Sequence, residues 1–360
     1  MTAIACELEA HSLQTHLEQI YTGFLQLHRS GRVRVRQRVV RKRVAGARPQ
    51  HLRDAFGYQL RAVVNGRIAI NYDTHDSWEI DESILPHVDL YFKRSYAPER
   101  IAALDPAARA KIRPLGLNYS VFPDGVDRFG FARALRLGRG MQRIRSAARA
   151  LAMTDRFAFT PRVHAMSAPP DFDTPPKIVF MVRTFDPHDH AQRAPEKIAE
   201  RHALNDARAD LIRALRREWG PRFYGGFVHT PHALGRYPDL LVPERARGSK
   251  GGYIAHMRAF PVGVATTGIH GSTGWKFAEY IAFAKAIVAE PLQYRATGDL
   301  APERNYLEFT SVDRCLAAIA RLFDDEALRH GMMANNARYY DDYVRPDRLV
   351  MNTIEAALAL

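Results

Sequence analysis

Short apolar runs alternate with longer amphipathic stretches along the second half of the chain. Runs such as KIVFMVR, which begins at Lys177, have the length and composition of buried strands, and the stretches between them have the apolar spacing of helices. Strands separated by helices predict a parallel sheet covered on both faces, as in an α/β fold. The expected strands are 177–183, 221–228, 261–266, 286–290 and 305–309, and the expected helices are 193–217, 249–259, 274–284, 312–323, 325–337 and about 338–358.

The first half begins with helical periodicity over 11–29 and then changes to a period of two. In RVRVRQRVV (32–40) arginines alternate mainly with valines, which predicts a strand with one basic face. We interpret it as a solvated edge strand, with a surface for a membrane or an acidic acceptor and a nucleic-acid surface as the alternatives. Asn65–Gly66, between GYQLRAVV and RIAINY, predicts a β-hairpin. Another strand is expected at 87–95, and helices near 98–112 and 131–152.

The composition is that of a globular protein, with 46% hydrophobic residues, and its net charge of +13 favours anionic partners such as phosphates, anionic lipid or nucleic acid. No apolar run reaches the length of a transmembrane helix. The N-terminal segment lacks the apolar core of a secretory signal. Cys6 and Cys315 fit no metal or redox spacing, which favours a reducing compartment. We expect a cytoplasmic protein, with peripheral contact to the inner face of an anionic membrane as an extension of that hypothesis.

A proline-rich stretch divides the chain. TPRVHAMSAPPDFDTPPK (160–177) carries five prolines and precedes an apolar strand pattern. Such a composition is typical of a linker. We therefore expect an N-terminal domain over 1–165, a linker over 166–176 and a C-terminal domain over 177–344.

The segment HGSTGWKFAE (270–279) joins the expected strand 261–266 to the next helix. Ligands of open α/β sheets bind beyond the carboxyl ends of the strands, where this loop is expected to lie. The N–H groups and positive dipole end of the helix, together with Lys276, suit a phosphate or diphosphate. Glu279 repels a phosphate and suits ribose hydroxyls. These features predict a nucleoside diphosphate site, and an ordinary solvated helix start is the alternative. The loop residues assigned to this site are His270, Gly271, Ser272, Thr273 and Gly274.

Two common phosphate motifs are absent from this loop. A P-loop has the pattern G-x-x-x-x-G-K-[ST]. Here Trp275 separates Gly274 from Lys276, and Phe277 stands where the hydroxyl residue is required. The dinucleotide pattern G-x-G-x-x-G is absent as well, so we expect neither a Walker ATPase nor that dinucleotide site.

TTGIHGSTGWKFAEYIAFAKAIVAEPL (266–292) and NYLEFTSVDRCLAAI (305–319) resemble the donor half of GT-B glycosyltransferases. The resemblance covers about 177–358 and is weak over 1–165. It implies two Rossmann-like domains facing a cleft, with a nucleotide sugar bound by the C-terminal domain and the acceptor by the N-terminal one. It also implies that a last helix, about 345–358, kinks and crosses back to the N-terminal domain.

The same resemblance implies roles for single residues. Glu279 stands at the second glutamate of the family's E-x7-E motif, which contacts the ribose, and Arg183 resembles the arginine that binds the diphosphate. The first glutamate of the motif falls at Gly271, which His270 and Ser272 flank. No lysine follows Arg183 at the family's usual distance, so Lys276 is expected to supply the second positive charge.

An inverting transferase requires a general base on the acceptor side. The segment YDTHDSWEID (72–81) follows an expected strand, and its Asp73, His75 and Asp76 are the candidates. An Asx-rich turn or a helix cap is the alternative interpretation. No metal site is expected, because the polar runs 171–173 and 186–190 have spacings that are common in loops.

The sequence therefore predicts a metal-independent glycosyltransferase. The donor is a nucleotide-diphospho-sugar that acts as a substrate, with no resident cofactor, and the acceptor is a hydroxyl of a glycan, a lipid-linked molecule or another compound. A GT-B-like protein that binds nucleotide or glycan without turnover is the first alternative. A nucleic-acid-binding protein is the second; it is disfavoured because the basic strand contains no aromatic residue on which a base could stack.

Overall fold

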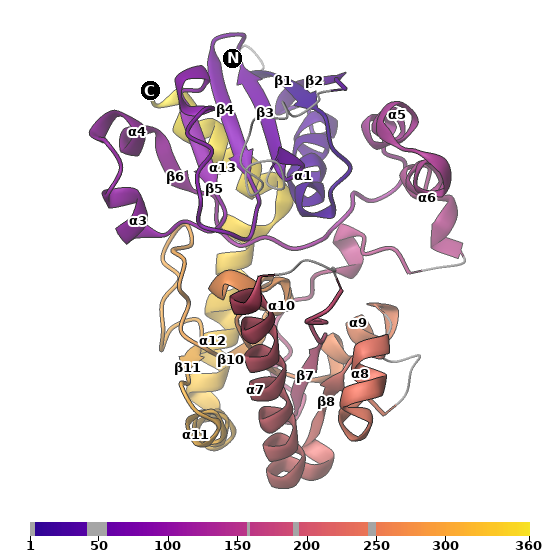
Figure 1. The fold of residues 1–360 in the computed structure, drawn as a ribbon, viewed down its shortest axis with the longest axis vertical. Coiled ribbons are helices and arrows are strands. Elements are labelled where there is room, and N and C mark those ends of the chain that lie inside the picture. Colours follow the sequence, from indigo (N-terminus) through magenta and orange to yellow (C-terminus); the bar gives the residue numbers. More distant parts are fainter. Residues whose placement is uncertain (1–3, 42–55, 157–158, 190–193, 244–249) are drawn as a thin grey trace. The chain divides into compact units, whose positions relative to one another are not determined.

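The structure is a computed structural model that describes residues 4–41, 56–156, 159–189, 194–243 and 250–360. Its contacts divide the chain into two compact units (Figure 1). Unit 1 comprises the chain up to residue 164 together with 294–298 and 341–360, and unit 2 comprises 165–293 and 299–340. Each unit has its own sheet and its own apolar core, which confirms the predicted α/β class.

Unit 1 contains a six-stranded sheet in the order β2-β1-β3-β4-β5-β6. The strands are β1 (Ile4–Ala10), β2 (Val33–Val39), β3 (Gln59–Val64), β4 (Ile68–Asp73), β5 (Leu90–Lys93) and β6 (Ile112–Pro114). β3 runs antiparallel to β1 and β4, whereas the other neighbours pair in parallel. The carboxyl ends of the five parallel strands therefore meet the amino end of β3 at one edge, which we call the carboxyl edge.

The predicted basic strand is β2, at the edge of this sheet. Val33 and Val35 are buried, whereas Arg34 and Arg36 are exposed, as a period of two requires. Arg38 pairs with Glu9 of β1. The interpretation as a solvated edge strand is therefore confirmed. The predicted hairpin is confirmed as the antiparallel pair β3–β4.

Two helices from opposite ends of the chain pack together in unit 1. They are α1 (Glu18–Arg29) and α13 (Pro346–Leu358), and residues of both belong to the core that includes the strands. Gly23 permits their close approach, because a Cβ there would lie 2.1 Å from the Pro346 carbonyl oxygen. The Tyr72 hydroxyl of β4 lies 2.6 Å from the Thr353 hydroxyl of α13. The C-terminal helix is thereby built into the core of unit 1.

The remaining helices of unit 1 are shorter than the sequence predicts. The stretch 98–112 forms α3 (Pro98–Ala102) and α4 (Pro106–Lys111), since Pro106 starts a new helix. The stretch 131–152 forms α5 (Arg128–Leu137) and α6 (Gly140–Ala150). Gly138 separates them, and a Cβ there would lie 2.6 Å from the Ala134 carbonyl oxygen. Gly140 has a φ of 46°, which favours glycine.

Unit 2 contains a five-stranded parallel sheet in the order β11-β10-β9-β7-β8. Its strands are β7 (Ile178–Val182), β8 (Phe223–Phe227), β9 (Val262–Ala265), β10 (Ala286–Ala289) and β11 (Leu307–Glu308). All five strands lie within the ranges expected from the sequence. Residues of β7, β9 and β10 are buried throughout, as a sheet covered on both faces requires.

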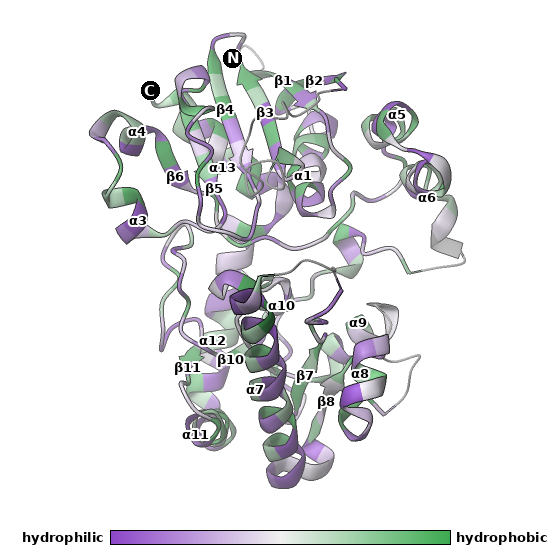
Figure 2. Cartoon of the chain, viewed as in Figure 1, coloured by the Kyte–Doolittle hydropathy of each residue, from purple (hydrophilic) through white to green (hydrophobic). Residues whose placement is uncertain are grey.

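The helices of unit 2 are α7 (Pro195–Trp219), α8 (Pro231–Arg236), α9 (Lys250–Ala259), α10 (Trp275–Ala282), α11 (Val312–Asp324) and α12 (Glu326–Tyr339). In Figure 2 α7 carries both polar and apolar positions, because one side of it packs on the sheet. The structure supplies one helix that the sequence analysis did not expect, α8, which Thr230 caps through its side chain.

The chain returns from unit 2 to unit 1 for the last time after α12. A π-helical turn (Tyr340–Val344) links α12 to α13, which begins at Pro346. Proline is well suited to the first turn of a helix because the N–H that it lacks would have no helical partner. The expected single helix over 338–358 is therefore two helices with a break. Among the described residues, no helix is long and apolar enough to span a bilayer.

Candidate functional site

The sheet of unit 2 reverses its strand order at β7. The chain passes from β7 to β8 on one side, and β9 then pairs with the other side of β7. In open parallel sheets, ligands bind beyond the carboxyl ends of the strands at such a reversal. The segments that follow β7 and β9 are therefore the expected binding loops. We call residues 183–186 the β7 loop and residues 266–274 the β9 loop.

Arg208 of α7 connects these two loops. Its guanidinium donates to the Arg183 carbonyl oxygen at 2.9 Å, the Thr267 carbonyl oxygen at 2.9 Å and the Thr266 hydroxyl at 3.1 Å. The side chain is buried, and burial lowers the pKa of Arg208 to about 10, against the opposing effect of Glu290. One buried cation thus holds the backbone at the end of β7 and the end of β9.

Asn205 holds the β7 loop one turn earlier on α7. Its side-chain amide donates to the Phe185 carbonyl oxygen at 2.7 Å and accepts from the Phe185 N–H at 2.9 Å. The sequence places Arg201, Asn205 and Arg208 on one helix face, and all three are buried. Arg208 therefore binds two loop carbonyls and a threonine hydroxyl rather than an acid of its own helix. Asp210 instead pairs with Arg213.

The β9 loop has a strained, compact backbone. His270 has a φ of 61° and Gly271 a φ of 64°, and the Gly268 N–H donates to the Ser272 carbonyl oxygen at 2.8 Å. The His270 N–H donates to the Glu200 carboxylate of α7 at 2.6 Å. Thr267 donates its N–H and its hydroxyl to Glu290, at 2.6 and 2.7 Å. The loop is thereby fixed from two sides before α10 begins.

The start of α10 is suited to an anion in one respect. Gly274 is its N-cap and has no side chain to accept from the first-turn N–H groups. Ser272 is buried, whereas Thr273 and Gly274 are half-buried. The arrangement leaves the positive end of the helix dipole without a protein carboxylate at the cap position.

Lys276 and Glu279 of α10 both interact with one tyrosine of α9, Tyr253. The Lys276 ammonium lies 3.3 Å from the centroid of the Tyr253 ring, a cation–π contact between α10 and α9. Glu279 is buried, with 2% of its surface exposed. Burial first, and then the Glu279 carboxylate, raise the pKa of Tyr253 well above its usual range. This burial leaves Glu279 little surface for the predicted contact with a ribose.

Arg183 differs from these residues because its side chain is exposed. It follows β7 directly, and its own backbone carbonyl is held by Arg208. Its guanidinium therefore projects from a fixed backbone position at the strand reversal. Of the predicted site residues in unit 2, Arg183 is the cation most accessible to a ligand.

A second polar cluster lies at the carboxyl edge of unit 1, where β4 and β5 end. Asp73 closes β4 and is 1% exposed. It accepts from Lys93 at 2.9 Å, from the His75 N–H at 2.9 Å and from the Tyr91 hydroxyl. A buried carboxylate with three donors is already satisfied, which favours a structural role over the predicted role as a base.

Asp76 and His75 are more accessible than Asp73. Arg94 and Asp76 form an ion pair, and His16 lies 4.0 Å from the other Asp76 oxygen. Burial alone would raise the pKa of Asp76, but Arg94, His16 and His75 together lower it below its usual value. The Tyr58 ring makes edge-on contacts with the rings of His16 and His75. We call His16, Tyr58, His75, Asp76 and Arg94 the edge cluster.

The sequence analysis missed His16 and Tyr58. His16 lies in a short 3-10 helix after β1 and Tyr58 in the turn before β3, and they meet residues 73–76 because β1, β3 and β4 share the carboxyl edge. Burial, followed by the charge of Arg94, lowers the pKa of His16 to about 4, so this imidazole is neutral at pH 7. The relative directions of β1, β3 and β4 would have been needed to predict that His16 and Tyr58 lie close to Asp76.

No group of three or more potential metal ligands occurs among the described residues. Asp186 accepts from the His188 N–H at 2.9 Å, as in an Asx turn. His190 lies outside the described residues, so the run 186–190 is described only in part.

No family model matches the chain, and no curated protein matches it. Solved structures do. The C-terminal domain of a glycosyl transferase group 1 family protein (LpcC) from Francisella tularensis is 14% identical, with a TM-score of 0.35, over 51% of this chain and 97% of its own. HepE from Anabaena, in complex with UDP and glucose, is 11% identical, with a TM-score of 0.36, over 96% of this chain and 95% of its own.

A third match is the glycotransferase of kitacinnamycin, 13% identical with a TM-score of 0.36, over 99% of this chain and all of its own. Two of these three structures are named as glycosyltransferases. TM-scores of this size leave the function of this chain to be argued from its own residues.

Proposed function

We propose that this protein is a glycosyltransferase whose unit 2 binds the nucleoside diphosphate of a nucleotide-sugar donor. The proposal depends on the two loops at the strand reversal. The buried Arg208 ties these loops together, and one of them carries the exposed Arg183. An accessible cation on a preorganised backbone stabilises the negative charge that develops on a leaving diphosphate. The N-terminus of α10 adds a second positive region beside the β9 loop.

Residue roles follow from these positions. We assign diphosphate binding to Arg183, together with the backbone N–H groups of 270–274. Lys276 contributes its charge from the first turn of α10, where Tyr253 holds the ammonium. Glu279 lies buried beside Tyr253, so we assign it to positioning that tyrosine, in place of the ribose contact first predicted. Cationic side chains then take the role that a metal ion has in other transferases.

The acceptor hydroxyl, of a glycan or a lipid-linked molecule, is assigned to unit 1. His75 and Asp76 are the two candidate bases that remain once Asp73 is recognised as a satisfied buried carboxylate. Asp76 is ionised at neutral pH, and its lowered pKa makes it a weaker base than an aspartate in water. A general base must be unprotonated and within reach of its proton, and both residues are half-buried rather than buried.

Thermal unfolding in the presence of UDP, GDP, ADP, CDP and dTDP tests the donor site. A ligand that binds only the folded protein raises the melting temperature by mass action. One of the five diphosphates should stabilise the wild type, and Arg183→Gln should reduce that shift. Arg217→Gln is the matched control, because Arg217 is exposed at the far end of α7. The absence of a shift with all five would contradict the donor assignment.

A protein that binds nucleotide or glycan without turnover is the second candidate, since position 271 is glycine where the family motif has glutamate. Release of free sugar from the matching nucleotide sugar distinguishes the two. Slow hydrolysis that Arg183→Gln abolishes supports a transferase. Binding with no hydrolysis and no transfer to any acceptor supports the second candidate.

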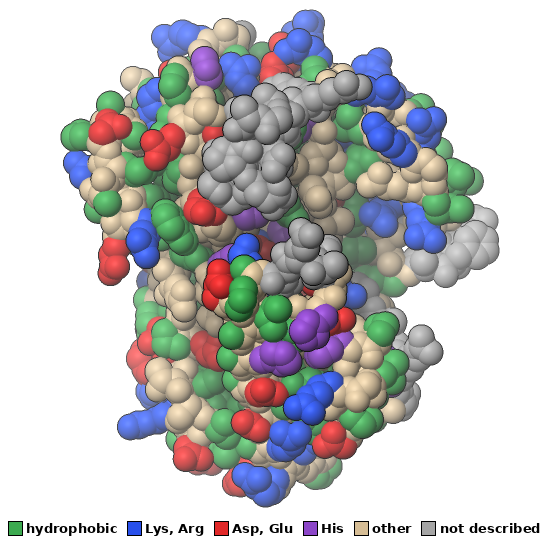
Figure 3. Space-filling model, in the orientation of Figure 1, with side chains coloured by type: hydrophobic (Ala, Val, Ile, Leu, Met, Phe, Trp, Pro, Cys, Tyr) green, Lys and Arg blue, Asp and Glu red, His purple; other side chains and the backbone are tan. Residues whose placement is uncertain are grey.

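We also propose a cytoplasmic location with peripheral contact to an anionic membrane through α6. Met141 and Ile144 of this helix are 58% and 62% exposed, and Arg145 beside them is exposed too. Figure 3 shows basic and apolar side chains next to one another over α5 and α6. Apolar residues flanked by arginines match a bilayer surface that carries negative headgroups. Both described cysteines are free thiols, which agrees with a reducing compartment.

Sedimentation with vesicles tests this contact. Binding to phosphatidylglycerol vesicles and not to phosphatidylcholine vesicles is expected, and Met141→Ser with Ile144→Ser should abolish it. Phe172→Ser, at a residue of unit 2 that is also exposed, is the control and should leave binding unchanged. Equal binding by the double variant would contradict the assignment to α6.

A further inference from the structure

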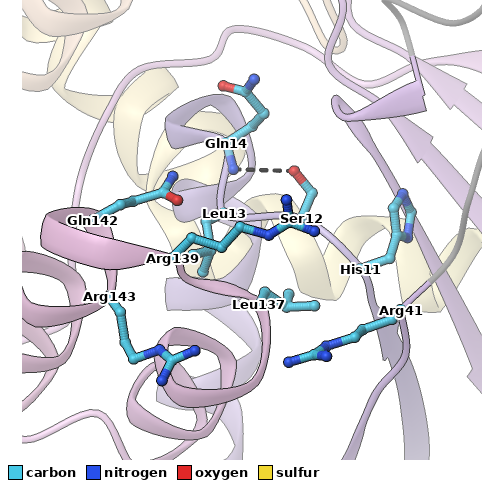
Figure 4. Close-up of a pocket in the computed structure, with 9 residues that line it drawn as sticks. All are labelled: His11, Ser12, Leu13, Gln14, Arg41, Leu137, Arg139, Gln142 and Arg143. Atoms are coloured by element: carbon cyan, nitrogen blue, oxygen red, sulfur yellow. Dashed lines mark hydrogen bonds between the residues drawn. The ribbon is translucent and has the colours of Figure 1, made fainter.

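A cavity of about 710 Å³ opens at the carboxyl edge of unit 1, apart from the edge cluster. Its lining comes from the loop after β1, from Arg41 after β2, and from the end of α5, the start of α6 and the turn between them (Figure 4). A cavity of this size falls within the range of small-molecule sites. The loop after β1 continues into His16, so one loop contributes to both the cavity and the edge cluster.

Three arginines dominate the lining, Arg41, Arg139 and Arg143, and among the described residues no carboxylate lines the cavity. Nε of Arg41 donates to the Arg136 carbonyl oxygen at 2.9 Å, and Nε of Arg143 donates to the Gly138 carbonyl oxygen at 3.0 Å. These bonds fix the guanidinium groups without neutralising them. Figure 4 shows the side chains of Arg41 and Arg143 extending toward one another from opposite sides.

The backbone supports the same charge. Arg139 is the N-cap of α6, and it makes no side-chain bond to the first-turn N–H groups. Gln142 and Arg143 belong to that first turn, so the positive end of the helix dipole faces the cavity lining. The turn before α6 is tightly packed and requires glycine at 138, because a Cβ there would lie 2.6 Å from the Ala134 carbonyl oxygen.

We propose that this cavity binds a phosphate or diphosphate group carried by the acceptor. Arginine forks match phosphate oxygens in pairs, and three of them suit a group with several negative charges better than a single carboxylate. Leu13 and Leu137 add an apolar part to the lining. The assignment to the acceptor rests on the proposed transferase function, whereas anion binding by the cavity is a property of unit 1 and can be measured alone.

Calorimetric titration with inorganic pyrophosphate tests the site. The full-length Arg183→Gln variant is the background, because it removes the exposed cation of the proposed donor site. Arg139→Gln and Arg143→Gln should each weaken binding about ten-fold. Arg128→Gln is the matched control, because Arg128 is exposed at the start of α5 and does not line the cavity; it should change the affinity by less than about two-fold. Equal losses for Arg143→Gln and Arg128→Gln would show general attraction to basic charge and would overturn the proposal.

The source of the phosphate is resolved by a second titrant. Farnesyl diphosphate bound about ten-fold more tightly than pyrophosphate would indicate an acceptor on a prenyl carrier, and equal affinities would indicate a soluble one. Nucleoside diphosphate binding to otherwise wild-type Arg143→Gln protein separates this proposal from the donor site. If pyrophosphate binding depends on Arg143 while no nucleoside diphosphate binds, the cavity stands and the transferase function fails. If a nucleoside diphosphate binds while pyrophosphate binding does not depend on Arg143, the cavity proposal alone fails.

Discussion

The cations that follow the carboxyl ends of the strands have different partners in the two units. In unit 1, Lys93 and Asp73 form an ion pair that is almost fully buried, and Arg94 is paired with Asp76. In unit 2, the buried Arg208 binds backbone carbonyls and a threonine, while Arg183 is exposed. A cation already paired with a carboxylate has little attraction left for a ligand anion. The ends of β4 and β5 in unit 1 therefore carry cations that carboxylates compensate, whereas the strand reversal of unit 2 carries the exposed cation of the proposed donor site.

Breaking the buried pair in unit 1 should have the largest effect. Asp73→Asn removes the charge that compensates Lys93, at 0% exposure, and should lower the free energy of unfolding by about 3–5 kcal/mol. Lys93→Met should cost a similar amount, while the double variant should lose less than the sum of the two. Urea unfolding monitored by circular dichroism measures all three. Additive losses would show that the two charges do not interact.

Removing the cation that ties the loops of unit 2 should weaken both nucleoside diphosphate binding and the stability of the fold. Arg208→Met deletes three hydrogen bonds to the β7 and β9 loops, and we expect nucleoside diphosphate affinity to fall about 30-fold or more. The unfolding free energy should fall by about 2–3 kcal/mol. Arg213→Met, at an exposed position of the same helix, is the control for binding. An unchanged affinity in Arg208→Met would show that nucleoside diphosphate binding does not depend on the contacts of Arg208 with these loops.

The edge cluster should make unit 1 sensitive to acid. The folded-state pKa of His16 is about 4, below its usual 6.5, so the unfolded chain binds the proton more readily. Its contribution to stability is present above pH 6.5 and is lost as the pH falls from 6.5 toward 4. Between pH 6.5 and 4, the free energy of unfolding of His16→Gln should fall by about 2 kcal/mol less than that of the wild type. Identical pH profiles would contradict the burial of a neutral imidazole in this cluster.

Lys276 should have the smallest effect of the cations considered. Its ammonium is held on the Tyr253 ring, so Lys276→Met removes a long-range charge from the donor site. We expect nucleoside diphosphate affinity to fall about three-fold, compared with ten-fold or more for Arg183→Gln, by isothermal calorimetry. A larger loss for Lys276→Met than for Arg183→Gln would reverse the assigned roles.

The strands and most helices followed from local patterns. The alternation in 32–40, the turn at Asn65–Gly66 and the apolar runs of unit 2 each act within a few residues. The first strand, Ile4–Ala10, was missed because its short run of mixed residues gives no strong period. Helices near 98–112 and 131–152 were predicted too long, because Pro106 and Gly138 were given too little weight.

The candidate sites were predictable only in part. The β9 loop and Arg183 were found because each directly follows an apolar run. The face of α7 that carries Arg208 was also visible, but its loop partners were not, since they lie 25 to 59 residues away. The burial of Asp73 and Glu279 depends on tertiary packing, and that packing changed the role assigned to each.

The central claim is that unit 2 binds a nucleoside diphosphate through Arg183 at the strand reversal. Isothermal calorimetry with the diphosphate that stabilises the wild type, on Arg183→Gln and Arg217→Gln proteins, tests it most directly. The account predicts an affinity loss of about ten-fold or more for Arg183→Gln and none for Arg217→Gln. Equal affinities for the two variants, or no binding by the wild type, would contradict it.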